Sequence, residues 1–195
     1  PLRDGDPVFS GRYGNIYTAR QLLQLFREAQ SGEADTACAI QREDGRFVDI
    51  NRPFMEEDGF ATAADVLAAR KEHISAIWPM FEDAEVFVFT LGLTEAWVNP
   101  ETGKVYPICP GVYSEDTSVK YDFVNFTYED VTADMEQFIA ELMKVNPGVK
   151  ILLTVSPVPL TATYSDAHVL VATSLSKSVL RVVVDHLVRA SENVF

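Results

Sequence analysis

Two polar segments carry side chains suited to chemistry, and each follows a short apolar run. Thr94 and Glu95 come just after the run VFVFTL at 86–91, and Ser156 comes directly after the run KILLTV at 150–155. Both runs are rich in β-branched or aromatic residues and too short for a typical helix, which predicts two strands buried on both faces. Open α/β sheets bind ligands in the crevice outside the carboxyl ends of their strands. The sequence therefore predicts a binding site at this sheet edge.

The segment 156–171, SPVPLTATYSDAHVLV, brings Asp166 and His168 to the same edge. A histidine two residues from an aspartate, in a loop above a sheet, has the chemistry of a general base or of a donor to a substrate. It could equally anchor the loop by bonding to backbone groups. Glu95 also has two interpretations, a carboxylate poised over the crevice or a cap at a helix entry. Both pairs of alternatives stay open from the sequence alone.

A third candidate segment, Gly14-Asn15, lies just before a predicted helix start. Thr18 and Gln21 have the spacing of a capping box, so the loop that holds Gly14 feeds a helix N-terminus. Backbone N–H groups point outward there and favour negative charge. The simpler interpretation is that Gly14 supplies a positive φ in a turn.

Several familiar site motifs are absent from the sequence. There is no GxSxG elbow, no P-loop and no GxGxxG. Cys38 and Cys109 are the only cysteines, neither lies in a CxxC, and no cluster of metal ligands surrounds them. We therefore expect no metal and no organic cofactor, and two free thiols of a reducing compartment, which favours a cytoplasmic protein.

Length and composition predict one globular domain spanning residues 1–195. The chain is 47% hydrophobic and carries a net charge of -13, from 16 Lys+Arg against 29 Asp+Glu. Such an acidic chain repels phosphates, which argues against a broad nucleic-acid or anionic-membrane surface. No stretch approaches the roughly 18 consecutive apolar residues of a membrane span. The sequence does not indicate the oligomeric state.

The order of the expected elements indicates the fold class. An amphipathic helix between the two strand-like runs makes a βαβ unit, which requires a parallel sheet with a right-handed crossover. Asp-Gly and Thr-Gly dipeptides predict two hairpin insertions, and a further strand is expected where the chain reaches Phe195. Helices are expected at 18–31, 62–81 (with Pro79 ending or kinking it), 128–145 and 172–189, hairpins around 43–46 and 100–103, and a loop over the sheet edge at 109–125.

Three long segments together resemble the bacterial GSCFA family. They are FSGRYGNIYTARQLLQLF at 9–26, FVFTLGLTEAW at 87–97 and LLTVSPVPLTATYSDAHVLVATSLSKSVLR at 152–181. That family is grouped with the Ser-Gly-Asn-His (SGNH) hydrolases, which are flavodoxin-like, three-layer α/β enzymes that cleave or transfer acyl esters, often on carbohydrates. The resemblance implies a parallel sheet with flanking helices and a serine-type ester hydrolase or acyltransferase.

The resemblance also assigns roles to residues. Gly14 matches the superfamily glycine whose N–H donates into the oxyanion hole, and Thr94 occupies the place of an asparagine that is usually another donor. The nucleophilic serine is then expected upstream of Pro1, and the Asp-x-x-His block downstream of Phe195. Further pocket residues implied for substrate binding are Asn15, Gly92, Glu95, Ser156 and His168. The alternative is a non-catalytic module that holds a glycan or acyl group in the same crevice.

Overall fold

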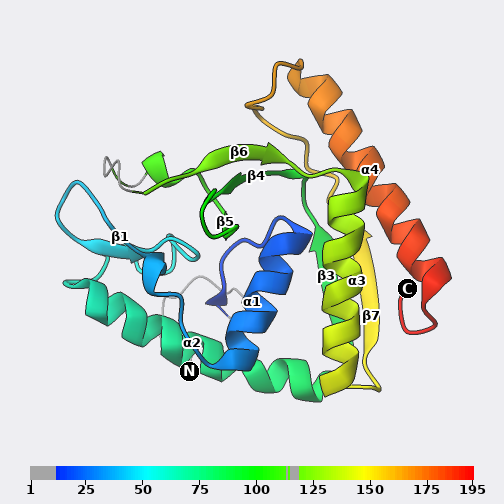
Figure 1. Ribbon diagram of the computed structural model, residues 1–195, viewed down its shortest axis with the longest axis horizontal. Helices are drawn as coiled ribbons and strands as arrows, with labels where there is room; N and C mark the ends of the chain where they lie inside the picture. Colours follow the sequence, from blue (N-terminus) through cyan, green and yellow to red (C-terminus); the bar gives the residue numbers. More distant parts are fainter. Residues whose placement is uncertain (1–11, 113, 115–118) are drawn as a thin grey trace.

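A pair of parallel strands forms the centre of the structure. The computed structural model describes residues 12–112, 114 and 119–195 (Figure 1). In it, β3 (Val86–Leu91) pairs with β7 (Lys150–Val155) in a continuous parallel register, and α3 (Tyr128–Val145) lies between them in the chain. The predicted βαβ unit is therefore confirmed. Residues 1–11, 113 and 115–118 lie outside the described part; they include the start of the 9–26 segment and a part of the loop expected at 109–125.

Three of the four long helices begin with the same local device. A threonine caps α1 (Ala19–Ser31), α2 (Ala63–Asp83) and α3, and in each the third residue of the helix bonds back to the threonine N–H. This reciprocal arrangement satisfies donors that a helix start leaves unpaired. The fourth helix, α4 (Val169–Ala190), is capped by His168 instead.

The second helix continues past the proline that was expected to end or kink it. α2 runs through Pro79 to Asp83. Proline removes one backbone donor and crowds the preceding turn, but Ile77 and Phe81, on either side of it, are both buried in the core. Their packing offsets that local cost, so the helix does not end at Pro79.

The core between helices and sheet is built around a phenylalanine cluster. Phe26 of α1 lies edge-on to Phe81 and to Phe138, with ring centroids 5.0 and 5.6 Å apart. Phe87 of β3 joins them, 5.3 Å from Phe138. Aromatic pairs at such separations add to the free energy that their burial already contributes. This cluster fixes α1, α2 and α3 against the inner face of β3.

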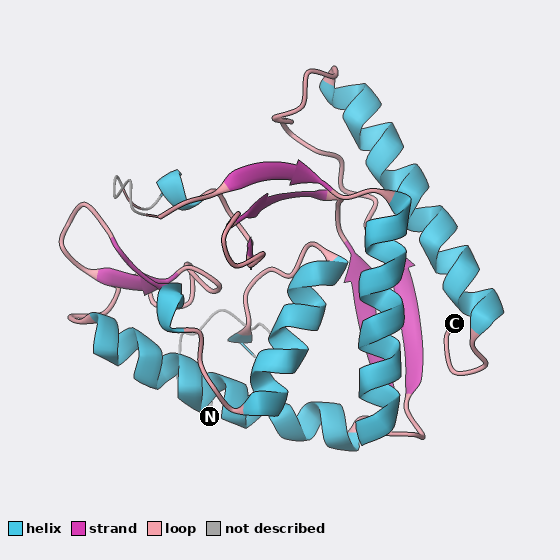
Figure 2. Cartoon of the chain, in the orientation of Figure 1, coloured by secondary structure: helices cyan, strands magenta, loops and turns pink. Residues whose placement is uncertain are grey.

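The parallel strands are buried on one face only, within the described residues. Phe87, Phe89 and Leu91 point into the core, whereas Val86 and Val88 are 53% and 58% exposed. The prediction of strands buried on both faces was therefore wrong here, because α1, α3 and α4 all pack against the same side (Figures 1 and 2). The architecture is mixed α/β with a parallel pair.

Small antiparallel sheets are attached to this unit. The predicted hairpins are confirmed as β1 (Ala39–Gln41) with β2 (Phe47–Asp49), and β4 (Glu95–Val98) with β5 (Val105–Tyr106). The 109–125 segment is not all loop, since it contains a short 3₁₀ turn at Pro110–Val112 and a strand, β6 (Asp122–Asn125), that pairs with β4. A second 3₁₀ turn, Thr36–Cys38, precedes β1.

The pairing of aromatic side chains explains why β6 forms. Phe123 lies opposite Trp97 of β4, with ring centroids 5.8 Å apart. Cross-strand aromatic pairs of this kind stabilise a strand that is too short to be recognised by its own pattern.

The last helix begins three residues earlier and ends one residue later than predicted. Its apolar spacing predicts a buried face made of Leu175, Val179, Leu180, Val183, Leu187 and Val188. Leu180, Val183 and Leu187 are buried and Val179 is partly buried, but Leu175 and Val188 are exposed, and Ser176 and Val184 are buried instead. After α4 the chain turns and Val194 forms a single parallel bridge with Ile151, so the expected strand is present only as a bridge beside β7. The N–H of Ile151 donates to the Asn193 carbonyl at 2.7 Å.

Candidate functional site

A crevice with a volume of about 480 Å³ opens at the carboxyl ends of β3 and β7. Three predicted site residues, Gly92, Glu95 and Ser156, line it together with the loop that follows β7. The position is the one expected for a ligand site on a parallel sheet. Gly14, Asn15, Thr94 and His168 are not among its lining residues.

Glu95 holds the loop after β7 against the sheet. Its Oε1 accepts a hydrogen bond from the Thr163 hydroxyl at 2.6 Å, and that hydroxyl also accepts from the Ser165 N–H at 3.0 Å. Glu95 is the first residue of β4, so its interpretation as a helix-entry cap was wrong. It is a crevice carboxylate with one oxygen engaged by the loop.

Thr94 is buried, and its polar groups are used within the fold. The Oγ1 donates to Oδ1 of Asn125 at 2.6 Å, and the N–H donates to Oγ of Ser176 at 3.1 Å. Only 1% of the residue is exposed. In this arrangement the Thr94 hydroxyl does not donate into the crevice.

Gly92 is fixed from both sides. Its N–H donates to the Tyr17 carbonyl at 2.9 Å, and its own carbonyl accepts from Nζ of Lys177 at 2.5 Å. A Cβ at this position would lie 2.9 Å from the Tyr17 carbonyl oxygen, so only glycine fits. Burial lowers the pKa of Lys177. No sequence motif singles out Lys177, because it lies 85 residues along the chain from Gly92.

Gly14 does not line the crevice. It lines a separate hollow of about 210 Å³ with Thr90 of β3 and has a φ of 69°, as the turn interpretation requires. Within the described residues its N–H forms no hydrogen bond. Asn15 is exposed and borders a cavity of only about 20 Å³ together with Arg70.

Ser156 and His168 are both bonded to backbone groups of their own loop. The Ser156 Oγ accepts from the Val158 N–H at 3.2 Å, and the Ser156 N–H donates to the Leu91 carbonyl at 2.9 Å. His168 is exposed, and its Nδ1 accepts from the Leu170 N–H at 3.3 Å. Its position supports the anchor interpretation, in which it caps α4.

An aromatic wall forms the side of the crevice that the sequence did not predict. Trp97 lies edge-on to Tyr164 with ring centroids 4.5 Å apart, and Phe123 lies 6.1 Å from Tyr164. These rings come from β4, β6 and the loop after β7. The available signal was one aromatic residue in each strand, Trp97 in β4 and Phe123 in β6, but using it required knowing that the two strands pair.

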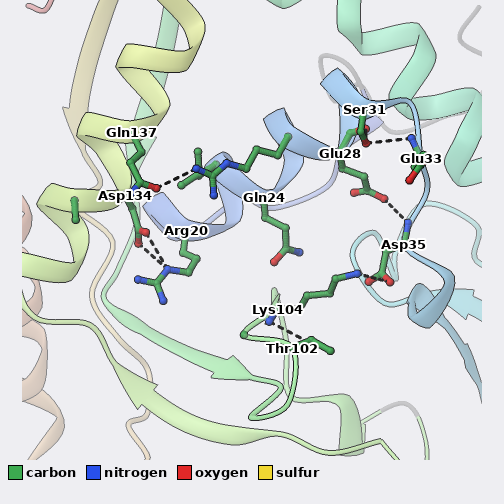
Figure 3. Close-up of a pocket in the computed structure, with 14 residues that line it drawn as sticks. Arg20, Gln24, Glu28, Ser31, Glu33, Asp35, Thr102, Lys104, Asp134 and Gln137 are labelled. Atoms are coloured by element: carbon green, nitrogen blue, oxygen red, sulfur yellow. Dashed lines mark hydrogen bonds and ion pairs between the residues drawn. The ribbon is translucent and has the colours of Figure 1, made fainter.

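A second, larger hollow of about 590 Å³ lies between α1, α3 and the β4–β5 turn (Figure 3). Its charged side chains bind one another. Arg20 holds Asp134 with two bonds of 2.9 Å, and Lys104 pairs with Asp35. Burial raises the pKa of Asp134, which the Arg20 guanidinium partly counteracts. This hollow therefore offers few free groups to a ligand, and the crevice is the better candidate.

The described part of the chain contains neither a group of metal ligands nor a helix suited to a membrane. No three His, Cys, Asp or Glu side chains are grouped there in a way that could hold a metal ion. None of the helices in that part combines the length and apolarity needed to cross a bilayer.

The fold is that of an α/β protein with a crevice at the carboxyl ends of a parallel strand pair. The sequence profile of the GSCFA family matches residues 6–195, so the chain belongs to the GSCFA family. Searches of curated proteins and of solved structures returned no match.

Proposed function

We propose that this chain is part of a serine-type ester hydrolase or acyltransferase with the three-layer, flavodoxin-like SGNH architecture. The observation that carries the proposal is the convergence of two loops on one crevice at the carboxyl ends of β3 and β7, where Tyr17, three residues after Gly14, also lines the crevice. The exposed outer face of β3 and β7 is compatible with a second helical layer.

In the proposed reaction a serine hydroxyl attacks the carbonyl carbon of an ester, and a histidine accepts the proton. The tetrahedral intermediate carries a negative oxygen that needs hydrogen-bond donors. It then expels the alcohol, which takes the proton from the histidine. Water completes hydrolysis, or an acceptor hydroxyl completes transfer. The resemblance places this serine upstream of Pro1 and the histidine downstream of Phe195.

The proposed oxyanion donors within the chain are the Gly14 N–H and a second group, which is either the Thr94 hydroxyl or the Asn125 side-chain amide. The Gly14 N–H forms no hydrogen bond within the described residues. The Thr94 hydroxyl would have to leave Asn125 to donate. Alternatively Asn125 itself donates, because its Oδ1 accepts from Thr94 and its Nδ2 therefore points away. Asn125 lies opposite Glu95 in the β4–β6 register, next to the crevice.

The competing proposal is a binding module that holds a glycan or acyl group without cleaving it. It is favoured by the bonds that already occupy the Thr94 hydroxyl and the Gly92 N–H. For either function we place the protein in the cytoplasm, where Cys38 and Cys109 would stay as the free thiols that they are here.

A fluorophosphonate probe separates the two proposals, since it labels only an activated serine. We expect the polypeptide 1–195 to remain unlabelled and a longer product of the same gene to be labelled upstream of Pro1, as mapped by mass spectrometry. Labelling of the short polypeptide at Ser156, Ser165 or Ser174 would mean that the nucleophile is misplaced. A longer product that is folded but unlabelled would favour the binding module.

A further inference from the structure

We propose that the crevice binds the acyl part of a neutral ester, with the chain lying along the aliphatic and aromatic side chains that line the crevice. The inference rests on the proposed function, because it assigns a substrate class to that site. The observations that carry it are the apolar lining of the crevice and the absence of lysine and arginine among the described lining residues.

The loop side of the crevice is aliphatic and largely open to water. Val158, Pro159 and Leu160 follow one another along it, and Val112 contributes from the 3₁₀ turn. Val158 is 66% exposed and Val112 is 67% exposed, although both face a concave site. Apolar surface that is exposed in a hollow is typical of a ligand site, because covering it removes water from that surface.

The aromatic rings at the crevice do not share one plane. Tyr164 and Tyr121 both meet the Trp97 ring nearly at right angles, at interplanar angles of 79° and 87°. The aromatic surface that Trp97 and Tyr164 offer to a ligand is therefore uneven. An alkyl chain needs no flat partner and can follow an uneven apolar wall.

The charges of the crevice favour a neutral occupant. Among the described lining residues there is no lysine or arginine, and Glu95 is the one with a charge. The nearby Lys177 amine donates to the Gly92 carbonyl and does not line the crevice. A carboxylate or phosphate bound here would lose its hydration without gaining a cationic partner. The negative charge of Glu95 would also repel it. An uncharged ester avoids this cost.

Chain length provides a quantitative test. Each buried methylene contributes about 0.8 kcal/mol, which corresponds to a roughly fourfold change in Kd. The test ligands are methyl butanoate, methyl hexanoate and methyl octanoate, with sodium octanoate and methyl β-glucoside for comparison. Binding to the 195-residue chain is followed by ¹⁵N NMR at the indole N–H of Trp97. The indole of Trp78, which packs against the core, is an internal control.

We expect the Kd to fall about 200-fold over the four methylenes from methyl butanoate to methyl octanoate, with sodium octanoate and the glucoside binding more weakly than methyl octanoate. Val158→Asp should remove the dependence on chain length. Val182→Asp, at an exposed site on α4 outside the crevice, is the matched control and should keep it. The inference would be overturned by a Kd independent of chain length, by tighter binding of the carboxylate or glucoside, or by equal shifts at Trp78.

The outcome is independent of the fluorophosphonate result. Chain-length dependence without labelling of the longer gene product would leave an acyl-binding module. Labelling without chain-length dependence would leave an esterase whose acyl group lies elsewhere, and this inference would then be wrong while the proposed function stands.

Discussion

The Thr94 hydroxyl donates to Oδ1 of Asn125 across 2.6 Å, and this bond joins the end of the β3 loop to the end of β6. The bond places the buried Thr94 hydroxyl beside the Asn125 amide. In the SGNH pattern that Thr94 resembles, one asparagine usually occupies the Thr94 position. Thr94 then has a structural role that can be separated from a catalytic one.

Thr94→Val should destabilise the fold modestly. The substitution keeps the shape and removes one largely buried hydrogen bond, so we expect a loss of about 0.5–1.5 kcal/mol in the free energy of unfolding, measured with urea. Thr90→Val is the control, because the Thr90–Thr154 hydroxyl pair lies on the open face of the sheet and should matter by less than about 0.5 kcal/mol. In an active longer product, a loss of about 10²-fold or more in kcat with unchanged stability would show that Thr94 acts as an oxyanion donor.

Ser176→Ala should cost more than Thr94→Val. The Ser176 hydroxyl is the acceptor for the buried Thr94 N–H at 3.1 Å, and its removal leaves that donor without a partner. Such a loss costs about 1–3 kcal/mol. Ser174→Ala, on the exposed side of the same helix, should leave the urea midpoint nearly unchanged. Equal midpoints for the two variants would show that the Thr94 N–H finds another acceptor.

Features that depend on neighbouring residues could be predicted from the sequence, whereas features that join distant residues could not. The capping box of Thr18 and Gln21 needs only three residues of spacing, and the structure confirms it. The strand pairing of β3 with β7 was also predicted, since a helix between two short apolar runs leaves one common topology. By contrast, the bond from Lys177 to Gly92 joins residues 85 apart, and no local pattern signals it.

The errors have the same origin. The β6 strand has only four residues, and its stability depends on pairing with β4. The buried face of α4 was predicted correctly at Leu180, Val183 and Leu187 but wrongly at Leu175 and Val188, because apolar residues also lie on its exposed face and only packing against α3 and β7 decides which are covered. His168 looked like a possible base because its residue type fits, but its Nδ1 caps a helix.

Arg70→Met should destabilise the fold more than either of the substitutions at Thr94 and Ser176. Arg70 is buried between Glu28 and Asp49, with its Nε 3.0 Å from Glu28 Oε1 and its Nη1 3.6 Å from Asp49 Oδ2. Removing the guanidinium leaves two carboxylates short of a partner, which costs about 3–5 kcal/mol. Arg189→Met removes an exposed pair with Asp185 and should leave the unfolding midpoint nearly unchanged, because water screens that pair. Guanidinium unfolding of both variants tests this, and similar losses would contradict it.

The N-terminus of α3 should lose stability in acid through Asp130. Its Oδ2 accepts from both the N–H and the hydroxyl of Thr127 at 2.9 Å, and the backbone bond is the main reason that its pKa lies below the ordinary value of 3.8. A lowered folded-state pKa means that the stabilisation is fully present above the unfolded-state value and disappears as the pH falls through the folded-state value. The carboxyl is largely open to water, so we expect about 0.5 kcal/mol.

Asp130→Asn should therefore lower the free energy of unfolding at pH 7 and make little difference near pH 2.5, because asparagine can accept the same bonds but does not titrate. Glu129→Gln is the matched control. It removes a carboxylate from the same helix turn, and within the described residues Glu129 accepts no hydrogen bond. Urea unfolding of the three proteins at pH 7, 4 and 2.5 measures the effect. A gap between wild type and Asp130→Asn that stays constant over this range would show that the cap contributes through its geometry and not through its charge.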